Sequence, residues 1–245
     1  MTVHPEAAGS RRLDGVRAAV TGGTSGLGLA LVADLVRRGG RVAFVARTRD
    51  RVDAVARAYP GTIGIVGDVA KKDDIHPIAL QILGGLGGLD VLVNNASSLG
   101  PVPLALLADT ECEQFEEALA TNVLGPFRLT RALLGALQSS AREGRGSVVL
   151  NVSSDAAVTP YPQWGAYGAS KAALRHMTRI WEEELAPDGV HFLSIDPGDM
   201  NTPLHALAVP DADLASLLRP ETAAAQLADA IATVLARQPV AEERR

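Results

Sequence analysis

The chain has 245 residues, of which 47% are hydrophobic and 21% charged, and its formal net charge is −5. These values are typical of a globular protein and exclude the basic surface that nucleic-acid binding requires. No apolar run reaches the roughly 18 residues that span a bilayer, the N-terminus lacks a signal-peptide core, and the single cysteine allows no intrachain disulfide. We therefore expect a cytoplasmic protein that binds neither nucleic acid nor a membrane.

Short apolar runs alternate with helical patterns along the chain. In chain order we predict strand Val16–Val20, helix Leu27–Arg38, strand Arg41–Ala46, helix Asp50–Ala58, strand Thr62–Gly67, helix Asp74–Leu83, strand Leu89–Val93, helix Glu111–Ser140, strand Ser147–Val152, helix Gly165–Leu185, strand Val190–Ile195 and helix Pro220–Ala236. This alternation indicates βαβ units, and continuous apolar strands are typical of a parallel sheet covered on both faces. We predict an α/β, doubly wound Rossmann fold with six to seven parallel strands. No linker divides the chain, so one domain is expected over residues 1–245, with tails at 1–12 and 237–245.

A glycine-rich turn, TGGTSGLG at residues 21–28, joins the first predicted strand to the first helix. Backbone without side chains can approach a pyrophosphate closely, and the helix N-terminus offers free N–H groups and a positive dipole end. The alternative is a tight turn with packing glycines. The strand–turn–helix context near the N-terminus favours phosphate binding.

Arg47 follows the second predicted strand, where NAD-binding folds carry a carboxylate that holds the ribose hydroxyls. No Asp or Glu occurs there before Asp50, and an arginine at this position accommodates a 2′-phosphate instead. We predict that Arg47 binds that phosphate and that Arg49 is a solvated loop charge. The expected cofactor is NADP(H), with NAD(H) as the alternative.

Tyr167 and Lys171 are four residues apart on a predicted helix, so they share one of its faces. An ammonium near a phenol favours the phenolate, so we expect Lys171 to lower the pKa of Tyr167 toward the operating range. Such a phenol can give a proton to a carbonyl oxygen, or take one from an alcohol, while hydride moves at carbon. Ser154, at the carboxyl end of a predicted strand, could hydrogen-bond the same oxygen. Alone, the Tyr/Lys spacing would indicate a surface pair; with the serine and the glycine-rich turn it indicates an oxidoreductase.

Six short motifs together resemble the short-chain dehydrogenase/reductase family over nearly the whole chain. They are TGxxxGxG at 21–28, Gly67-Asp68-Val69, Val93-Asn94-Asn95-Ala96, Asn122 within Thr-Asn-Val, the set Ser154, Tyr167 and Lys171, and PGxxxT at 197–202. Each motif alone is loose, but six in order at the expected spacing are specific. The resemblance implies hydride transfer between NADP(H) and a small-molecule carbonyl or secondary alcohol.

The resemblance also implies roles for four catalytic residues. Tyr167 is the expected general acid/base, and Lys171 is expected to bind the nicotinamide ribose and tune Tyr167. Ser154 is expected to orient the substrate oxygen, and Asn122 to hold a water that links Lys171 to solvent.

Cofactor contacts are implied in the same way, with Asp68 and the Val69 backbone at the adenine, and Thr202 and the Met200 backbone at the carboxamide. The full expected set is Gly22, Thr24, Ser25, Gly26, Leu27, Gly28, Arg47, Asp68, Val69, Asn95, Ala96, Tyr167, Lys171, Pro197, Gly198, Met200 and Thr202. No metal ion is expected.

Three features depart from the family pattern. Ser97 replaces the glycine that usually closes the NNAG segment, and we expect the turn to persist with an effect on cofactor affinity. Ser25 replaces a basic residue that some NADP(H)-preferring members use, so the cofactor preference is less than absolute. At the C-terminus Pro239 lacks a donor N–H, which predicts six strands or a seventh of two or three residues.

That short C-terminus would leave a sheet edge exposed unless a partner subunit covers it. The resemblance implies a homodimer or homotetramer that forms through the helices predicted at Glu111–Ser140 and Gly165–Leu185.

We expect the substrate to contact Asp199–Arg219 together with Asp155, Gln163 and Trp164. His205 is interpreted as a solvated loop residue. Two other functions stay open: a non-catalytic nicotinamide-nucleotide-binding regulator, which loss of Tyr167 or Lys171 would have favoured, and an epimerase or dehydratase of the same family.

Overall fold

A parallel sheet forms the centre of the protein in the computed structural model, which describes residues 11–237. Its strands are β1 (Arg17–Thr21), β2 (Arg41–Ala46), β3 (Ile63–Val66), β4 (Val91–Asn94), β5 (Ser147–Val152) and β6 (Val190–Ile195). Within the described residues they pair in the order β3-β2-β1-β4-β5-β6, each pair parallel. The chain winds outward in opposite directions from β1 and β4, and open α/β sheets bind ligands where the strand order reverses in this way.

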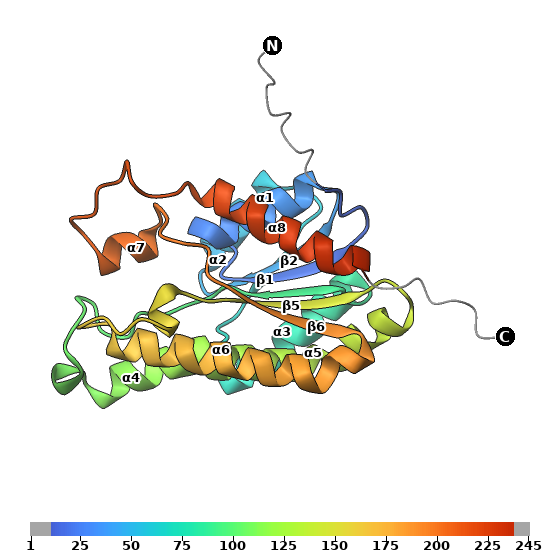
Figure 1. Cartoon of the computed structure of the whole chain (residues 1–245). Helices are drawn as coiled ribbons and strands as arrows, with labels where there is room; N and C mark the ends of the chain where they lie inside the picture. The colour runs from blue at the N-terminus through green and yellow to red at the C-terminus, as the bar shows by residue number, and fades with distance from the viewer. Residues whose placement is uncertain (1–10, 238–245) are drawn as a thin grey trace, which may run out of the picture.

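Helices cover both faces of the sheet (Figure 1). One face carries α1 (Gly26–Arg37), α2 (Arg49–Ala58) and α8 (Pro220–Arg237); the other carries α3 (Lys72–Leu86), α5 (Gly125–Arg142) and α6 (Gly165–Leu185). Within the described residues the remaining helical elements are α4 (Cys112–Leu119), a π-helical turn (Ala120–Leu124), α7 (Pro203–Ala208) and three 3₁₀ turns at Leu107–Asp109, Asp155–Ala157 and Ala186–Asp188. No helix within residues 11–237 combines the length and the hydropathy that a bilayer crossing needs.

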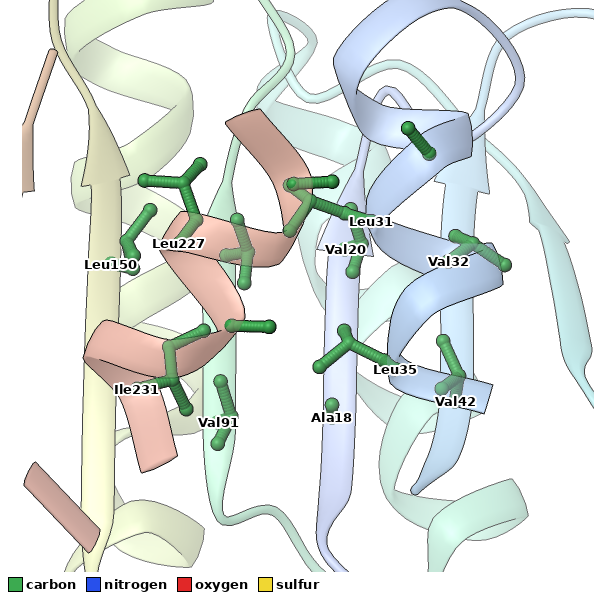
Figure 2. Close-up of a cluster of buried hydrophobic side chains, with 14 of the residues drawn as sticks. Ala18, Val20, Leu31, Val32, Leu35, Val42, Val91, Leu150, Leu227 and Ile231 are labelled. Carbon is green, nitrogen blue, oxygen red and sulfur yellow. The ribbon is translucent and has the colours of Figure 1, made fainter. Parts of the chain in front are cut away.

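Two apolar clusters hold these layers together. On one face, Leu31 and Leu35 of α1 and Leu227 and Ile231 of α8 pack over the strands, as Figure 2 shows. The neighbouring residues Val148 and Val149 of β5 belong to opposite clusters and are both fully buried. The sheet is therefore covered on both faces, as its continuous apolar strands predicted.

The predicted elements are confirmed with small shifts at their ends, and two corrections are needed. The single helix predicted over Glu111–Ser140 is divided by a π-helical turn at Ala120–Leu124 into α4 and α5. Helix α7 was not predicted, because six residues are too few to show a helical period. The six-stranded sheet is confirmed for the described residues, and the short seventh strand would fall within 238–245, outside them.

A chain of buried polar side chains sets the position of α6 on the sheet. Asn94 Nδ2 of β4 donates to Asn151 Oδ1 of β5 at 2.8 Å, and Asn151 Nδ2 donates to Thr178 Oγ1 of α6 at 2.9 Å. Thr178 Oγ1 in turn donates to the Leu174 carbonyl at 2.7 Å. Every group in this chain is nearly inaccessible to water, so a lost bond would leave a buried polar atom unpaired.

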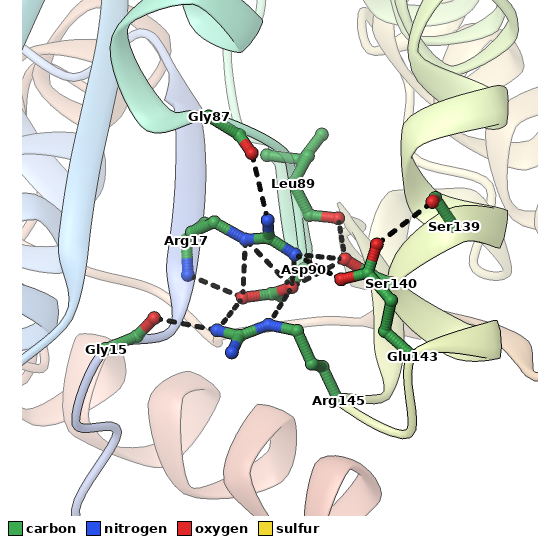
Figure 3. Close-up of polar contacts among 9 residues, drawn as sticks. All are labelled: Gly15, Arg17, Gly87, Leu89, Asp90, Ser139, Ser140, Glu143 and Arg145. Carbon is green, nitrogen blue, oxygen red and sulfur yellow. Dashed lines mark hydrogen bonds and ion pairs between the residues drawn. The ribbon is translucent and has the colours of Figure 1, made fainter. Parts of the chain in front are cut away.

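An ion cluster closes the opposite end of the sheet (Figure 3). The carboxylate of Asp90 is 1% exposed and accepts hydrogen bonds from Arg17 Nη2 at 2.6 Å, Arg145 Nη2 at 2.9 Å and Ser140 Oγ at 2.6 Å. Burial raises the pKa of Asp90, but these hydrogen bonds outweigh it and hold the pKa well below its usual value. The cluster joins the amino ends of β1 and β4 to the segments around α5.

Candidate active site

Two adjoining clefts open at the carboxyl ends of the strands. The first has a volume of about 430 Å³ and the second about 630 Å³. They share one wall, formed by Leu27, Asn95, Ser97, Leu99, Thr202 and Leu204. A molecule in one cleft can therefore contact a molecule in the other.

All the predicted cofactor contacts line one of these clefts. The first cleft holds Gly22, Thr24, Ser25, Gly26, Leu27, Gly28, Arg47, Asp68, Val69, Asn95, Ala96 and Thr202. The second holds Tyr167, Lys171, Pro197, Gly198 and Met200. The structure thus brings the glycine-rich turn and the Tyr/Lys pair to neighbouring positions, although they lie far apart in the sequence.

The glycine-rich turn packs tightly against the segment after β4. Gly22 has φ of 70°, in the left-handed region that favours glycine, and a Cβ on Gly28 would lie 2.2 Å from the Gly22 carbonyl oxygen. Asn95 Nδ2 donates to the Thr21 carbonyl at 2.8 Å, which ties the turn to β4. Ser25 makes no side-chain capping bond at the N-terminus of α1, so the helix amides there stay available. These residues fit the pyrophosphate of a dinucleotide, which needs free amides and close backbone approach.

Two arginines line the far part of the first cleft. Arg47 lies where it was predicted, whereas Arg49 does not line the cleft, in agreement with its interpretation as a solvated charge. Arg51, in the first turn of α2, lines the cleft as well and was missed. Arg47 lies before this helix and not on it, so no helical spacing pointed to Arg51.

Tyr167 and Lys171 lie at the inner end of the second cleft. They are 8% and 2% exposed, and Lys171 Nζ lies 5.5 Å from the centroid of the Tyr167 ring. The ammonium donates to the Val152 carbonyl at 2.8 Å. Ser154 Oγ donates to Asp155 Oδ1 at 3.0 Å, and its hydroxyl lowers the pKa of the Tyr167 phenol.

The predicted lowering of the Tyr167 pKa is wrong for this structure. Burial raises the pKa of Tyr167 to about 12, although the hydroxyls of Ser154 and Ser97 act in the opposite direction and lower it. Burial also lowers the pKa of Lys171 to about 8. The sequence pattern shows the two side chains as neighbours but not their depth, and removing both from water disfavours both charged forms.

Asn122 lines neither of the two clefts; it lies in the π-helical turn between α4 and α5 and is 1% exposed. Its Nδ2 donates to the Ser98 carbonyl and to Ser170 Oγ, both at 2.8 Å, and its Oδ1 accepts from Ser98 N at 2.8 Å. The side chain thus fixes the loop after β4 to α6. Its predicted link through water to Lys171 stays a prediction.

The outer wall of the second cleft is partly aromatic and strongly acidic. Trp164 packs edge-on to Tyr167 at 5.6 Å between ring centroids, and Tyr161 donates to Asp155 Oδ2 at 2.7 Å. Four carboxylates line the cleft, from Asp155, Asp196, Asp199 and Asp213, and no arginine among residues 11–237 does.

Two expectations about this wall change. His205 belongs to α7, its side chain is only 15% exposed and it lines the cleft, so its interpretation as a solvated loop residue is wrong. Gln163 does not line the cleft and has φ of 73° in the turn before α6. Tyr161 and Leu99 line the cleft, and Leu99 was missed because it carries no motif.

Comparison with known proteins gives consistent matches. The family model for short chain dehydrogenases matches residues 17–213. The chain is 32% identical over 225 residues to 2-(R)-hydroxypropyl-CoM dehydrogenase of Xanthobacter autotrophicus, covering 87% of this chain and 88% of that protein. A short chain dehydrogenase from Burkholderia cenocepacia, solved in complex with NADP, is 26% identical with a TM-score of 0.80 over 90% of this chain and 92% of its own. The 3-ketoacyl-(acyl-carrier-protein) reductase from Brucella melitensis, solved with NADH, is 28% identical with a TM-score of 0.82 over 94% of each chain.

Proposed function

The chain belongs to the short-chain dehydrogenase/reductase family of NAD(P)-dependent oxidoreductases, and we propose that it interconverts a carbonyl compound and a secondary alcohol with Tyr167 as the general acid/base. The observation that carries the proposal is the placement of Tyr167, Ser154 and Lys171 in one cleft that adjoins the glycine-rich turn.

The residues of the second cleft divide the chemistry between them. The Tyr167 phenol gives its proton to the carbonyl oxygen during reduction and takes it back from the alcohol during oxidation. Ser154 donates to the same substrate oxygen and so orients it. Lys171, held by the Val152 carbonyl, places a positive charge close to Tyr167 and favours the phenolate once it is formed.

The first cleft would hold the nicotinamide cofactor. The turn at residues 21–28 and the α1 amides would bind the pyrophosphate, Asp68 and Val69 the adenine, and Thr202 with the Met200 backbone the carboxamide. When bound, the cofactor supplies or accepts the hydride. We propose a preference for NADP(H), because Arg47 and Arg51 line the cleft beside β2 and the carboxylate of NAD-binding folds is absent from the end of that strand.

We also propose that the protein is a homodimer or homotetramer assembled through α5 and α6. Leu124, at the start of α5, and Ile180 of α6 are 41% and 46% exposed, so these helices offer apolar side chains to a second copy. Light scattering on the purified protein measures the mass directly, and a monomer at micromolar concentration would contradict the assembly.

Turnover by the wild type and by Tyr167→Phe tests the catalytic proposal. Ketones and aldehydes are screened for NADPH oxidation, and we expect Tyr167→Phe to abolish a measurable rate while it keeps NADPH affinity. Equal rates for the two proteins would remove Tyr167 from its role. Fluorescence titration with NADPH and NADH tests the cofactor preference, and tighter NADH binding would overturn it.

A further inference from the structure

A carboxylate holds the hydroxyl of Ser154. Asp155 follows Ser154 directly, at the start of the 3₁₀ turn after β5, and both residues line the second cleft. Ser154 Oγ donates to Asp155 Oδ1 at 3.0 Å, and Ala156 N donates to the same carboxylate oxygen at 2.7 Å and to Ser154 Oγ at 3.2 Å. Tyr161, from the loop before α6, donates to Asp155 Oδ2 at 2.7 Å. Both oxygens of the carboxylate are thus engaged, and two segments of the chain fix its orientation.

The direction of the bond between Ser154 and Asp155 follows from the charge on Asp155. The hydrogen bond from Tyr161, with those from Ser154 and the Ala156 amide, lowers the pKa of Asp155, so the carboxylate is ionised at neutral pH. An ionised carboxylate only accepts hydrogen bonds, so the proton in this bond belongs to Ser154. A hydroxyl has one proton and two lone pairs. The proton goes to Asp155 and one lone pair accepts from Ala156 N, which leaves one lone pair of Ser154 for a substrate.

An alcohol and a ketone fit this arrangement differently. Burial raises the pKa of Tyr167 to about 12, so at neutral pH its phenol can donate to the oxygen of either compound. An alcohol also brings an O–H group of its own, which can donate to the remaining lone pair of Ser154. A ketone oxygen only accepts, so it gains a bond from Ser154 only if that hydroxyl turns away from Asp155. The turn gives up a bond to an ionised acceptor, which is about twice as strong as a bond to a neutral one.

We infer that Asp155 is a positioning residue that makes Ser154 a hydrogen-bond acceptor, so that the second cleft binds a secondary alcohol more tightly than the ketone of the same carbon skeleton. The inference rests on the function proposed above and adds which of the two reactants the cleft favours. Asp155 acts through Ser154 and exchanges no proton with the substrate. Ser154 still donates to the ketone oxygen during reduction, because Asp155 Oδ1 keeps its bond from Ala156 N when the hydroxyl turns. The cost of that turn falls on the ketone complex alone.

The test compares Asp155→Ala, which removes the acceptor, with Asp155→Asn, which removes the charge but keeps an oxygen that can accept from Ser154. It uses a ketone and its alcohol that show turnover dependent on Tyr167. Complexes of the alcohol with NADPH and of the ketone with NADP⁺ cannot react, so both dissociation constants can be measured. We expect the wild type to bind the alcohol more tightly, and the ratio of ketone Kd to alcohol Kd to fall by about three- to tenfold in Asp155→Ala and by less in Asp155→Asn. Thermal unfolding of both variants reports separately on stability.

A second measurement needs neither cofactor nor substrate. Aspartate labelled with ¹³C at Cγ reports on the hydrogen bonds that each carboxylate accepts, and Asp155→Asn identifies the resonance of Asp155. We expect this resonance to shift in Ser154→Ala, which removes the donor, and to stay near its wild-type position in Ser154→Thr, which keeps a hydroxyl.

The outcomes separate this inference from the proposed function. If turnover depends on Tyr167 but Asp155→Ala leaves the ratio of dissociation constants unchanged, the inference is wrong and the proposed function stands. An equal fall in Asp155→Ala and Asp155→Asn would assign the effect to charge and would also overturn the inference. If no carbonyl compound shows turnover that depends on Tyr167, the proposed function fails; an unmoved Cγ resonance would then overturn the bond between Ser154 and Asp155 as well, and a moved one would support it.

Discussion

A methyl group added to Gly28 tests whether the glycine-rich turn is shaped for close backbone approach. In Gly28→Ala the new Cβ would lie 2.2 Å from the Gly22 carbonyl oxygen and 2.5 Å from Asn95 Nδ2, so the turn must shift. Overpacking against backbone costs about 3 kcal/mol, the upper end of its usual range, and the better helix propensity of alanine returns about 1 kcal/mol. The net loss of about 2 kcal/mol predicts a fall in melting temperature of roughly 4–8 °C for a protein of this size.

The same shift should displace the amides that we assign to the pyrophosphate. Loss of one charge-assisted hydrogen bond weakens binding by about tenfold or more, so NADPH titration should show at least that change in Kd. Gly84→Ala is the matched control, because Gly84 is also helical, in α3, and a Cβ there meets nothing within 4 Å. It should raise the melting temperature by roughly 2–4 °C and leave Kd unchanged. Equal behaviour of the two variants would refute the reasoning.

Three further predictions follow from charge. Asp90→Asn removes the carboxylate shared by two guanidinium groups and should lower the free energy of unfolding by about 3–5 kcal/mol in urea titrations. Because the pKa of Asp90 is depressed in the folded protein, its contribution to stability is present above about pH 4 and is lost as the pH falls below that. Acid titration of the wild type should show this loss, and the variant should not show the contribution of Asp90. Arg47→Ala should weaken NADPH binding by roughly 10–150-fold and leave NADH binding unchanged, with Arg49→Ala altering neither; a parallel loss for both cofactors would remove the 2′-phosphate role. The carboxylates of the second cleft, Asp155 and Asp199 among them, should favour a ketone that carries an ammonium over a ketone of equal length that carries a carboxylate. The ratio of the two kcat/KM values should shrink with added salt, and a preference for the carboxylate would contradict this prediction.

The fold was predictable because its signals are local. The short apolar runs of β5 and β6 differ plainly from the longer helical period of α6, and the predicted ends of all three match the structure. The π-helical turn at Ala120–Leu124 was not predictable, because it interrupts the backbone hydrogen bonding without a change in the apolar pattern. Helix α7 is too short to have a period.

The sequence predicted which residues form the site but not their pKa values. Motif order placed Tyr167 and Lys171 with the glycine-rich turn, and the structure brings them to adjoining clefts. The raised pKa of Tyr167 depends on how deeply tertiary packing buries it, which no spacing records. The position of His205 in the cleft wall likewise depends on how the segment after β6 folds over the strand ends.

The chain of buried polar side chains from Asn94 through Asn151 to Thr178 also controls how far α6 extends into the second cleft. Tyr167 lies eleven residues before Thr178, about 16 Å along the helix at 1.5 Å per residue. Sliding α6 by even one residue would break the bond between Asn151 and Thr178, which are both buried. Because Tyr167 and Lys171 lie on one rigid helix, they would move together, and their mutual spacing would survive while their reach toward a substrate changed. A substitution such as Thr178→Val, far from any reacting atom, would thus lower the catalytic rate by displacing Tyr167 and Lys171 relative to the substrate. Misplacement by about 1 Å can lower a rate by 10²-fold.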